Sequence, residues 1–348
     1  MAGNRTQLHG ILEVAELAGV SPATVSRALR GIPGVSAPTK AAVQRAAAEL
    51  GYVPSASASA LARGRTNTIG VMSQSIARWF FTAVIEGADD VIRSAGYEVL
   101  LVPLDETAGT AAVAHHFRSL RKRVDGVLGL NAPLPENRPV VQAVQLPLVT
   151  VGSVLEGVSG VLVDDVEVGY LATRHLTDLG HRRIAFLGLD PSDSFGLAVA
   201  NHRHDGYLRA LHEANLAPDP DLLGTTGFDV EGGVAALEEL MVKADWQRHR
   251  LPTAVVAVSD EVAMGVLYAA RRLGIQVPQE LSVVGVDDHD LAYLFELTTI
   301  SQPVREQGRI AADMLVRLLD HRSDPPEPQV IRMRPGLIER NTTAPPRC

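Results

Sequence analysis

The chain has 348 residues, of which 46% are hydrophobic and 21% charged, and this length exceeds what one hydrophobic core usually supports. Its only cysteine, Cys348, excludes a disulfide framework and a Cys-rich metal site, and no run of about 18 apolar residues implies a membrane span. We therefore expect a cytoplasmic protein of two or three domains with no membrane partner. The net charge of −8 is unevenly distributed, because residues 1–65 carry seven basic residues against three acidic ones. A basic head on an acidic body is expected of a protein whose head alone contacts nucleic acid phosphates.

Three short helices are predicted in the first 50 residues. Residues 11–18 place apolar side chains on one face and are followed by Gly19, a residue suited to the left-handed conformation that ends helices. Ser21 then provides an N-cap for a second helix over residues 22–29, and a third helix is predicted over residues 38–50. Two short helices joined by a tight glycine turn are typical of a helix-turn-helix, whose second helix enters the DNA major groove. A plain three-helix bundle has the same spacing, so spacing alone leaves both interpretations open.

The residues themselves resemble a known family. VAELAGVSPATVSRALRG, followed by VSAPTKAAVQRAAAELGYVPSASASALARGRTNTIGV, is similar at nearly every position to the DNA-binding head of the LacI/GalR family of transcriptional regulators. The resemblance implies that Pro22 and Ala23 lie where the family selects its operator sequence. It also implies that Arg27 is the major-groove arginine, able to pair with O6 and N7 of guanine.

Other head residues are expected to hold the DNA backbone. The hydroxyl groups implied to contact phosphates, each with helix capping as its alternative role, belong to Ser21, Thr24, Ser26 and Ser36. Two positions depart from the family pattern. Gly10 replaces a Thr that caps the first helix, and Arg30 replaces a common Asn and adds a positive charge near the backbone.

Residues 55–66 are rich in Ala and Ser and contain one large apolar residue, Leu61. Such a segment buries too little apolar surface to order itself, although its alanines favour a helix once something supports it. The resemblance implies a hinge helix that folds on operator DNA and inserts Leu61 into the minor groove, as architectural proteins do. A flexible linker is the alternative interpretation.

From residue 67 onward, short apolar runs alternate with amphipathic helices. The predicted strands form two series: residues 68–73, 98–103, 126–130, 148–152 and 161–163, then 183–188, 254–258 and 282–286. The predicted helices are residues 81–95, 168–179, 206–214, 231–242, 261–273 and 306–319. Strands alternating with helices indicate parallel sheets, and two series indicate two doubly wound lobes. The predicted fold is therefore α/β, with an all-α helix-turn-helix head on a two-lobed, periplasmic-binding-protein-like sensor body.

This body also resembles the family, through YLATRHLTDLGHRRIAFLG, AVVAVSDEVAMGVLYAARRLGI, PQELSVVGVDD and LTTISQPVREQGRIAADML. We expect a head over residues 1–54, a hinge over 55–66, a body over 67–340 and a tail over 341–348. The chain is expected to cross between lobes near residues 164, 290 and 325. The N-lobe would then hold 67–164 and 291–325, and the C-lobe 165–290 and 326–340.

Ligands of doubly wound folds bind beyond the carboxyl ends of the strands, here in the cleft between the lobes. By resemblance, the residues expected to bind a small-molecule effector are Phe80, Phe81, Arg203, Phe228, Asp287 and Gln302. Each has a structural alternative: the paired phenylalanines as core, Arg203 in a surface pair with Asp205, and Asp287 as a helix cap. Asp260 is expected to act mainly as the N-cap of the helix that follows it.

Two departures bear on the identity of the effector. Gly152 and Ser153 stand where the family usually has Asp-Arg, which removes a carboxylate from the expected sugar site, and Arg78-Trp79 replaces the usual Asn-Pro. The effector is expected to be a sugar or a related metabolite, and a larger, less hydroxylated or negatively charged ligand stays open. No GxGxxG or Walker-type loop follows the first body strand, so no nucleotide cofactor is expected, and no cofactor or metal of another kind either.

We therefore predict a DNA-binding transcriptional regulator, a repressor controlled by its effector. A single head reads one half-site, so a homodimer on a pseudo-palindromic operator is expected, with a tetramer as the larger alternative. The alternative functions are an effector-independent regulator, a solute-binding protein and an enzyme. Ser259 with Asp260, or His289 beside Asp287, lacks the spacing of a nucleophile elbow or a metal site, so catalysis is not expected.

Overall fold

The computed structural model describes residues 10–52, 65–73, 75–104, 110–131, 138–189, 197–247 and 250–347. The chain divides into two compact units, Met1–Thr66 and Asn67–Cys348. The predicted hinge, including Leu61, lies almost entirely outside the described residues. Within the described part, no helix is long and apolar enough to cross a membrane.

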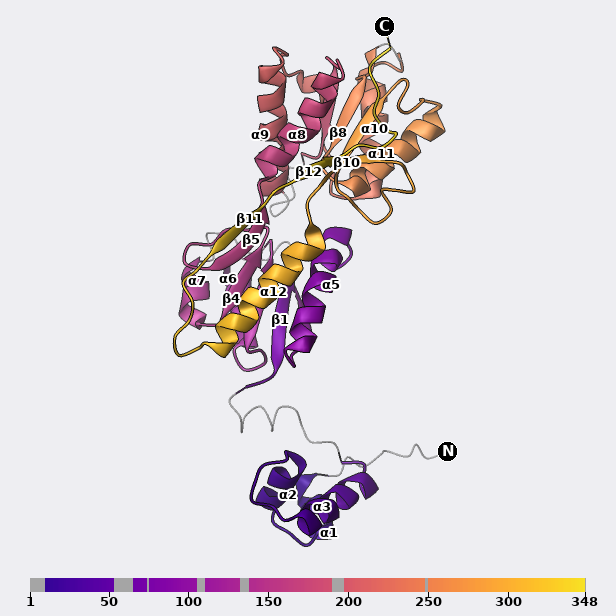
Figure 1. Ribbon diagram of the computed structural model, residues 1–348. Helices are drawn as coiled ribbons and strands as arrows, with labels where there is room; N and C mark the ends of the chain where they lie inside the picture. Colours follow the sequence, from indigo (N-terminus) through magenta and orange to yellow (C-terminus); the bar gives the residue numbers. More distant parts are fainter. Residues whose placement is uncertain are drawn as a thin grey trace, which may run out of the picture. The chain divides into compact units, whose positions relative to one another are not determined.

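In its described residues, the first unit contains three helices, α1 (Ile11–Leu17), α2 (Pro22–Leu29) and α3 (Ala37–Glu49), as predicted (Figure 1). Gly19, with φ +64°, makes the tight turn between α1 and α2, a conformation that costs glycine little. A small core of Val14, Val25 and Val43, each fully buried, joins one residue from each helix. These short helices are therefore held by tertiary packing, since helices of this length are marginal alone.

The first lobe of the body is built on a parallel six-stranded sheet with strand order β11-β5-β4-β3-β1-β2. Its strands are β1 (Thr68–Ser73), β2 (Glu98–Pro103), β3 (Gly126–Leu130), β4 (Leu148–Val151), β5 (Ser159–Val163) and β11 (Val330–Met333). Its helices are α5 (Trp79–Ser94), α6 (Thr110–Leu120), α7 (Arg138–Val144) and α12 (Val304–Asp320). Alternate residues of the strands enter two separate cores, one under α5 and α12 and one under α6 and α7, so helices cover both faces.

The second lobe repeats this plan with strand order β12-β10-β9-β8-β6-β7. Its strands are β6 (Ile184–Leu187), β7 (Leu223–Gly224), β8 (Ala254–Ala257), β9 (Ser282–Asp287), β10 (Thr298–Ser301) and β12 (Gly336–Ile338). Its described helices are α8 (Asp165–Asp178), α9 (Leu197–Glu213), α10 (Val230–Lys243) and α11 (Asp260–Leu273), together with the short 3-10 helix η2 (Pro220–Leu222). Only β12 runs antiparallel to its neighbour among the paired strands that the structure describes.

Two of the predicted lobe crossings come too early in the sequence. The chain crosses after β5 as expected near residue 164, but its second and third crossings follow β10 and β11 rather than lying near 290 and 325. The reason is pairing: β10 runs beside β9 in the second sheet, and β11 runs beside β5 in the first. The helix α12 then belongs to the first lobe, where it lies alongside α5 (Figure 1).

Two glycines allow α5 and α12 to approach closely. A Cβ at Gly87 would overlap the backbone of Arg305, and a Cβ at Gly308 would overlap the backbone of Val84. Larger residues at either position would force the helices apart. This contact holds the first turn of α12 against the middle of α5, and the starts of both helices carry side chains of the cleft.

Candidate functional site

The exposed face of α2 is the candidate DNA-binding surface of the head. Pro22, Ala23 and Arg27 are exposed there, while Arg30 is half-buried and donates from Nε to the carbonyl of Ser26 over 3.0 Å. Arg27 presents a guanidinium free to reach base edges, whereas part of Arg30 closes the end of its own helix.

The serines that begin α2 and α3 have the capping role that was the alternative to phosphate contact. Ser21 Oγ accepts from the N–H of Thr24 over 3.2 Å, and Ser36 Oγ accepts from the N–H of Thr39 over 3.3 Å. At α1, Gly10 has no side chain to offer, and its own N–H donates to the Glu13 carboxylate instead. Gly10 in place of the family's Thr therefore removes the side-chain cap of α1, but the bond from the Gly10 N–H to the Glu13 carboxylate remains.

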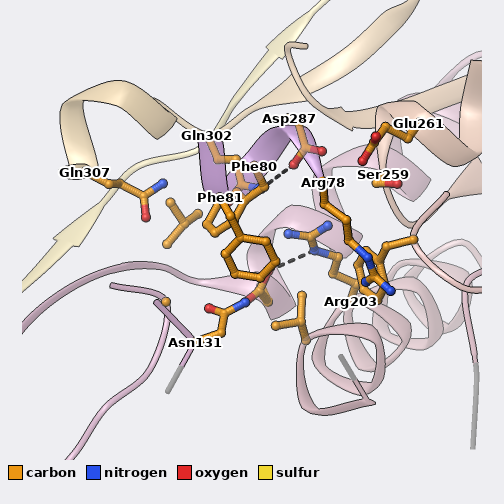
Figure 2. Close-up of a pocket in the computed structure, with 15 residues that line it drawn as sticks. Arg78, Phe80, Phe81, Asn131, Arg203, Ser259, Glu261, Asp287, Gln302 and Gln307 are labelled. Atoms are coloured by element: carbon orange, nitrogen blue, oxygen red, sulfur yellow. Dashed lines mark hydrogen bonds and ion pairs between the residues drawn. The ribbon is translucent and has the colours of Figure 1, made fainter. Parts of the chain in front are cut away.

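The body contains a cavity of about 60 Å³ between its lobes (Figure 2). From the first lobe it is lined by Arg78, Phe80, Phe81, Asn131, Gly152, Val163 and Gln307, and Gln302 lines it from the crossover between β10 and α12. From the second lobe it is lined by Asp165, Val199, Arg203, Phe228, Ser259, Glu261 and Asp287. The structure thus brings together all six of the residues expected to bind an effector.

Arg203 is buried in α9 and does not pair with Asp205. Its Nε donates to Asp165 Oδ1 over 2.9 Å, and its Nη1 donates to the carbonyl of Val258. Because a guanidinium has five N–H groups, those remaining on Arg203 are available to a molecule in the cavity. The pair with Asp165 locks the guanidinium in place and offsets the cost of burying its charge.

Asp287 ends β9 with φ +130°, a backbone conformation rare for any residue but glycine and often found at functional sites. Its Oδ1 accepts from Nε2 of Gln302 over 2.5 Å. Burial raises the pKa of the Asp287 carboxyl, and the Arg203 charge opposes this rise. No helix follows for Asp287 to cap, and the neighbouring Asp288 pairs with Arg340 over 2.7 Å instead.

Asp260 has a different role from the one expected. Ser259 is the N-cap of α11, with Oγ accepting from the N–H of Val262 over 3.3 Å. Asp260 is fully buried and accepts from the Thr299 hydroxyl over 2.6 Å and from the His289 N–H over 2.7 Å. Burial, with the charge of Asp287 adding to it, raises the pKa of Asp260. Its carboxyl therefore joins β10 to the loop after β9, and Asp260 does not line the cavity.

The aromatic side chains form the apolar part of the cavity. Phe81 is buried in the first lobe's core and meets Phe80 edge to face, with ring centroids 5.4 Å apart. Phe81 is therefore both core and lining, while Phe80 is half-buried. The Arg78 guanidinium lies over the Phe228 ring, 5.4 Å from its centroid, as a cation–π contact.

The amide of Asn131 lies beside Gly152, the position where the family usually has an Asp carboxylate. Gly152 has φ +78°, and a Cβ there would overlap Oδ1 of Asn131. Asn131 thus lies against the bare glycine and lines the cavity, whereas Ser153 does not line it. The expected loss of a carboxylate at this point is accompanied by the approach of an uncharged polar group.

A cluster at the rim of the cleft connects the lobes. Trp79 Nε1 donates to Asp290 Oδ2 over 3.0 Å, and its ring lies 4.7 Å from the ring of His289. Arg305 donates two hydrogen bonds, of 3.0 and 2.7 Å, to the Asp290 carboxylate, and it donates a third, of 2.8 Å, to the carboxylate of Glu86. Hydrogen bonds from Arg305 and Trp79 lower the pKa of Asp290. Trp79 therefore belongs to the rim and does not line the cavity.

Several lining residues were not predicted. Asn131, Asp165 and Ser259 each follow the carboxyl end of a parallel strand, so the strand-end rule that identified Asp287 would also have found them. Arg78 and Gln307 belong to helix ends, where no local signal distinguishes a lining residue from an exposed one. Within the described residues, no group of His, Cys, Asp and Glu is arranged to hold a metal ion.

Known proteins resemble this chain along nearly its whole length. Residues 10–55 match the family described as bacterial regulatory proteins of the lacI family, and residues 173–343 match a periplasmic binding protein-like domain. The HTH-type transcriptional repressor PurR of Yersinia enterocolitica is 36% identical over 346 residues, which is 96% of each chain. The chain belongs to the LacI family.

Solved structures of LacI-family regulators have the same fold. The lac repressor dimer bound to operator and the anti-inducer ONPF has 26% identity and a TM-score of 0.80, covering 97% of this chain and 100% of that one. The complex of the transcriptional regulator CelR with cellobiose has 30% identity and a TM-score of 0.68, covering 96% and 99%. This LacI-family chain is accordingly a DNA-binding transcriptional regulator with an effector-binding body, as the sequence predicts.

Proposed function

We propose that this chain represses transcription as a homodimer on a pseudo-palindromic operator and that a small polar molecule in the cleft controls its operator affinity. The observation that carries the proposal is the meeting of Arg203 and Asp287 from one lobe with Phe80 and Phe81 from the other around one cavity. A ligand that contacts both lobes favours one lobe arrangement, and it shifts the DNA-binding equilibrium by its differential affinity for the two arrangements.

The ligand is a sugar or a related metabolite. Asp287 and Asp165 offer carboxylate acceptors, and Arg203 offers charged donors, a combination that suits hydroxyl groups. The half-buried rings of Phe80 and Phe228 suit the apolar face of a ring. The solved relatives CelR, with cellobiose, and a regulator from Enterococcus faecium, with ribose, bind sugars. Gly152 in place of a carboxylate favours a ligand with fewer hydroxyl groups on that side.

In the head, Arg27 reads a guanine, and Pro22 and Ala23 add apolar contact and sensitivity to DNA shape. The residues that hold phosphates are Ser21, Thr24, Ser26, Arg30 and Ser36. Leu61 in the hinge enters the minor groove. The protein acts on chromosomal DNA in the cytoplasm, associated with the nucleoid, and is not an enzyme.

An exposed apolar segment in the second lobe supports the dimer. Leu291, Tyr293, Leu294 and Phe295 lie close together in the sequence and are 44%, 65%, 61% and 43% exposed. Contiguous apolar patches of this kind mark association surfaces, and a two-fold dimer would cover the same patch on both copies. Light scattering at micromolar concentration distinguishes the dimer from a monomer and from a tetramer.

The proposal is tested with the full-length protein and a panel of sugars, sugar phosphates and nucleosides. A compound that raises the Tm should also change the affinity for the operator identified by genome-wide footprinting. If no compound raises the Tm and operator affinity never changes, the chain is an effector-independent regulator. The neighbouring operons of the footprinted sites indicate the metabolic class of the ligand.

A further inference from the structure

Gln307 is a buried cleft residue with an unsatisfied hydrogen-bond donor. It lies one turn into α12, its side chain is 1% exposed, and it lines the cavity. Figure 2 shows this side chain extending from α12 toward the other lining residues. Its Nε2 is buried and has no hydrogen-bond partner among the described residues. Such a group destabilises the protein unless an acceptor reaches it.

A second glutamine in the same segment provides a contrast. Gln302 is equally buried, but its Nε2 donates to Asp287 Oδ1 over 2.5 Å. Gln302 therefore positions the Asp287 carboxylate, whereas Gln307 lines the cavity and its donor has no partner in the part of the chain that the structure describes. Of the described buried side-chain polar atoms that have no partner, only Nε2 of Gln307 belongs to a residue that lines this cavity.

We propose that Gln307 determines which ligand the cleft accepts, by donating from Nε2 to an oxygen or nitrogen acceptor on the ligand edge that faces α12. This inference rests on the proposed ligand control of the regulator. Asp287, at the end of β9 in the other lobe, accepts from hydroxyl or N–H groups on a different edge of the ligand. The preferred ligand therefore has a carbonyl, carboxylate, ether or ring-nitrogen acceptor toward α12. A site built to hydrogen-bond one group rejects analogues that lack it, because its own polar atom is then left unpaired.

Gln307→Met removes the donor and keeps the size and flexibility of the side chain. The Tm of the ligand-free, full-length protein should rise, because the buried unpaired amide is gone. Gln302→Met should lower the Tm, because it leaves the Asp287 carboxyl without its donor. Gln329→Met makes the same chemical change at an exposed position and should leave the Tm unchanged. A lower Tm in Gln307→Met would show that the side chain supports the fold and would overturn the proposal.

The ligand test uses D-ribose, cellobiose, D-glucose 6-phosphate and adenosine as probes in thermal shift and calorimetry. For a probe that binds the unmodified protein, Gln307→Met should weaken binding at least tenfold, and Gln307→Glu, which has only acceptors when ionised, should weaken it as well. Equal binding by the unmodified protein and Gln307→Met, or retained binding by Gln307→Glu, overturns the role of Gln307 alone. If no probe binds the unmodified protein, the ligand-control proposal fails and this inference fails with it.

Discussion

The indole Nε1 of Trp79 donates to Asp290 Oδ2 over 3.0 Å and thereby joins the two lobes at the rim of the cleft. Arg305 binds the same carboxylate from the first lobe, so Asp290 receives three hydrogen bonds across the lobe boundary. Asp290 and Arg305 are largely exposed, so each bond stabilises closure by only about 1 kcal/mol or less. A small contribution still matters here, because the equilibrium between lobe arrangements is the quantity that a ligand shifts.

Trp79→Phe removes the bond to Asp290 and keeps an aromatic ring beside His289. Losing about 1 kcal/mol should shift the lobes toward the open arrangement by about fivefold. The ligand-free protein should then show a larger radius of gyration in small-angle scattering, and a cleft ligand should bind up to about fivefold more weakly. Trp246→Phe, at an exposed tryptophan, is the matched control. An unchanged radius and an unchanged ligand affinity would show that the rim cluster does not set lobe closure.

Arg203→Met should abolish the response to ligand and destabilise the body. The change leaves Asp165 and the carbonyl of Val258 without their buried partner, which costs about 3 kcal/mol. Operator affinity at low temperature should stay near that of the unmodified protein, because the head is a separate unit. Arg209→Met alters an exposed arginine of the same helix and serves as control. A ligand response that survives in Arg203→Met would place the effector elsewhere.

Leu61→Ala should have the opposite effect, with operator binding weakened and ligand affinity nearly intact. A minor-groove wedge helps to bend the operator, and the wider contact of the bent DNA offsets an unstacking cost of a few kcal/mol. Fluorescence anisotropy with operator DNA and calorimetry with ligand measure the two affinities separately. Equal loss of both would contradict the assignment of Leu61 to the DNA-binding hinge.

Much of the head and the cleft could be predicted because the signals are local. Gly19 and Ser21 mark the helix boundaries within a few residues of each other, and Asp287 is the last residue of an otherwise apolar strand. The strands β10 and β11 had no such signal, since they are short and only partly apolar. The partner of β11 is β5, more than 160 residues earlier in the chain, and such pairing is not encoded in a local pattern. The lobe crossings were therefore placed too early.

Glu261 makes the stability of the body depend on pH. Burial, with the nearby charge of Asp287 adding to it, raises the pKa of Glu261 from its ordinary 4.5 to about 7. The folded protein then holds this proton more tightly than the unfolded chain, so the contribution of Glu261 to the free energy of unfolding falls as pH rises from about 4.5 to about 7 and is level above. In Glu261→Gln, the Tm should fall less over this interval and should exceed that of the unmodified protein above pH 7. Glu327→Gln, at an exposed glutamate, should follow the unmodified protein. Parallel curves for Glu261→Gln and the unmodified protein would contradict the raised pKa.

Arg27→Ala should weaken operator binding and relax its specificity at one base pair. Arg27 is the exposed arginine of α2, and a bidentate contact with guanine discriminates by about 1–3 kcal/mol. Arg30→Ala is the informative comparison, because Arg30 is half-buried against Ser26 and is expected to contact phosphate. Its removal should weaken binding to all sequences alike and reduce the slope of log affinity against log salt by about 1. Binding to a set of operators with single base-pair changes, at several salt concentrations, separates the two roles. If Arg27→Ala weakens every operator equally, Arg27 holds the backbone and sequence is read by the shape of the DNA.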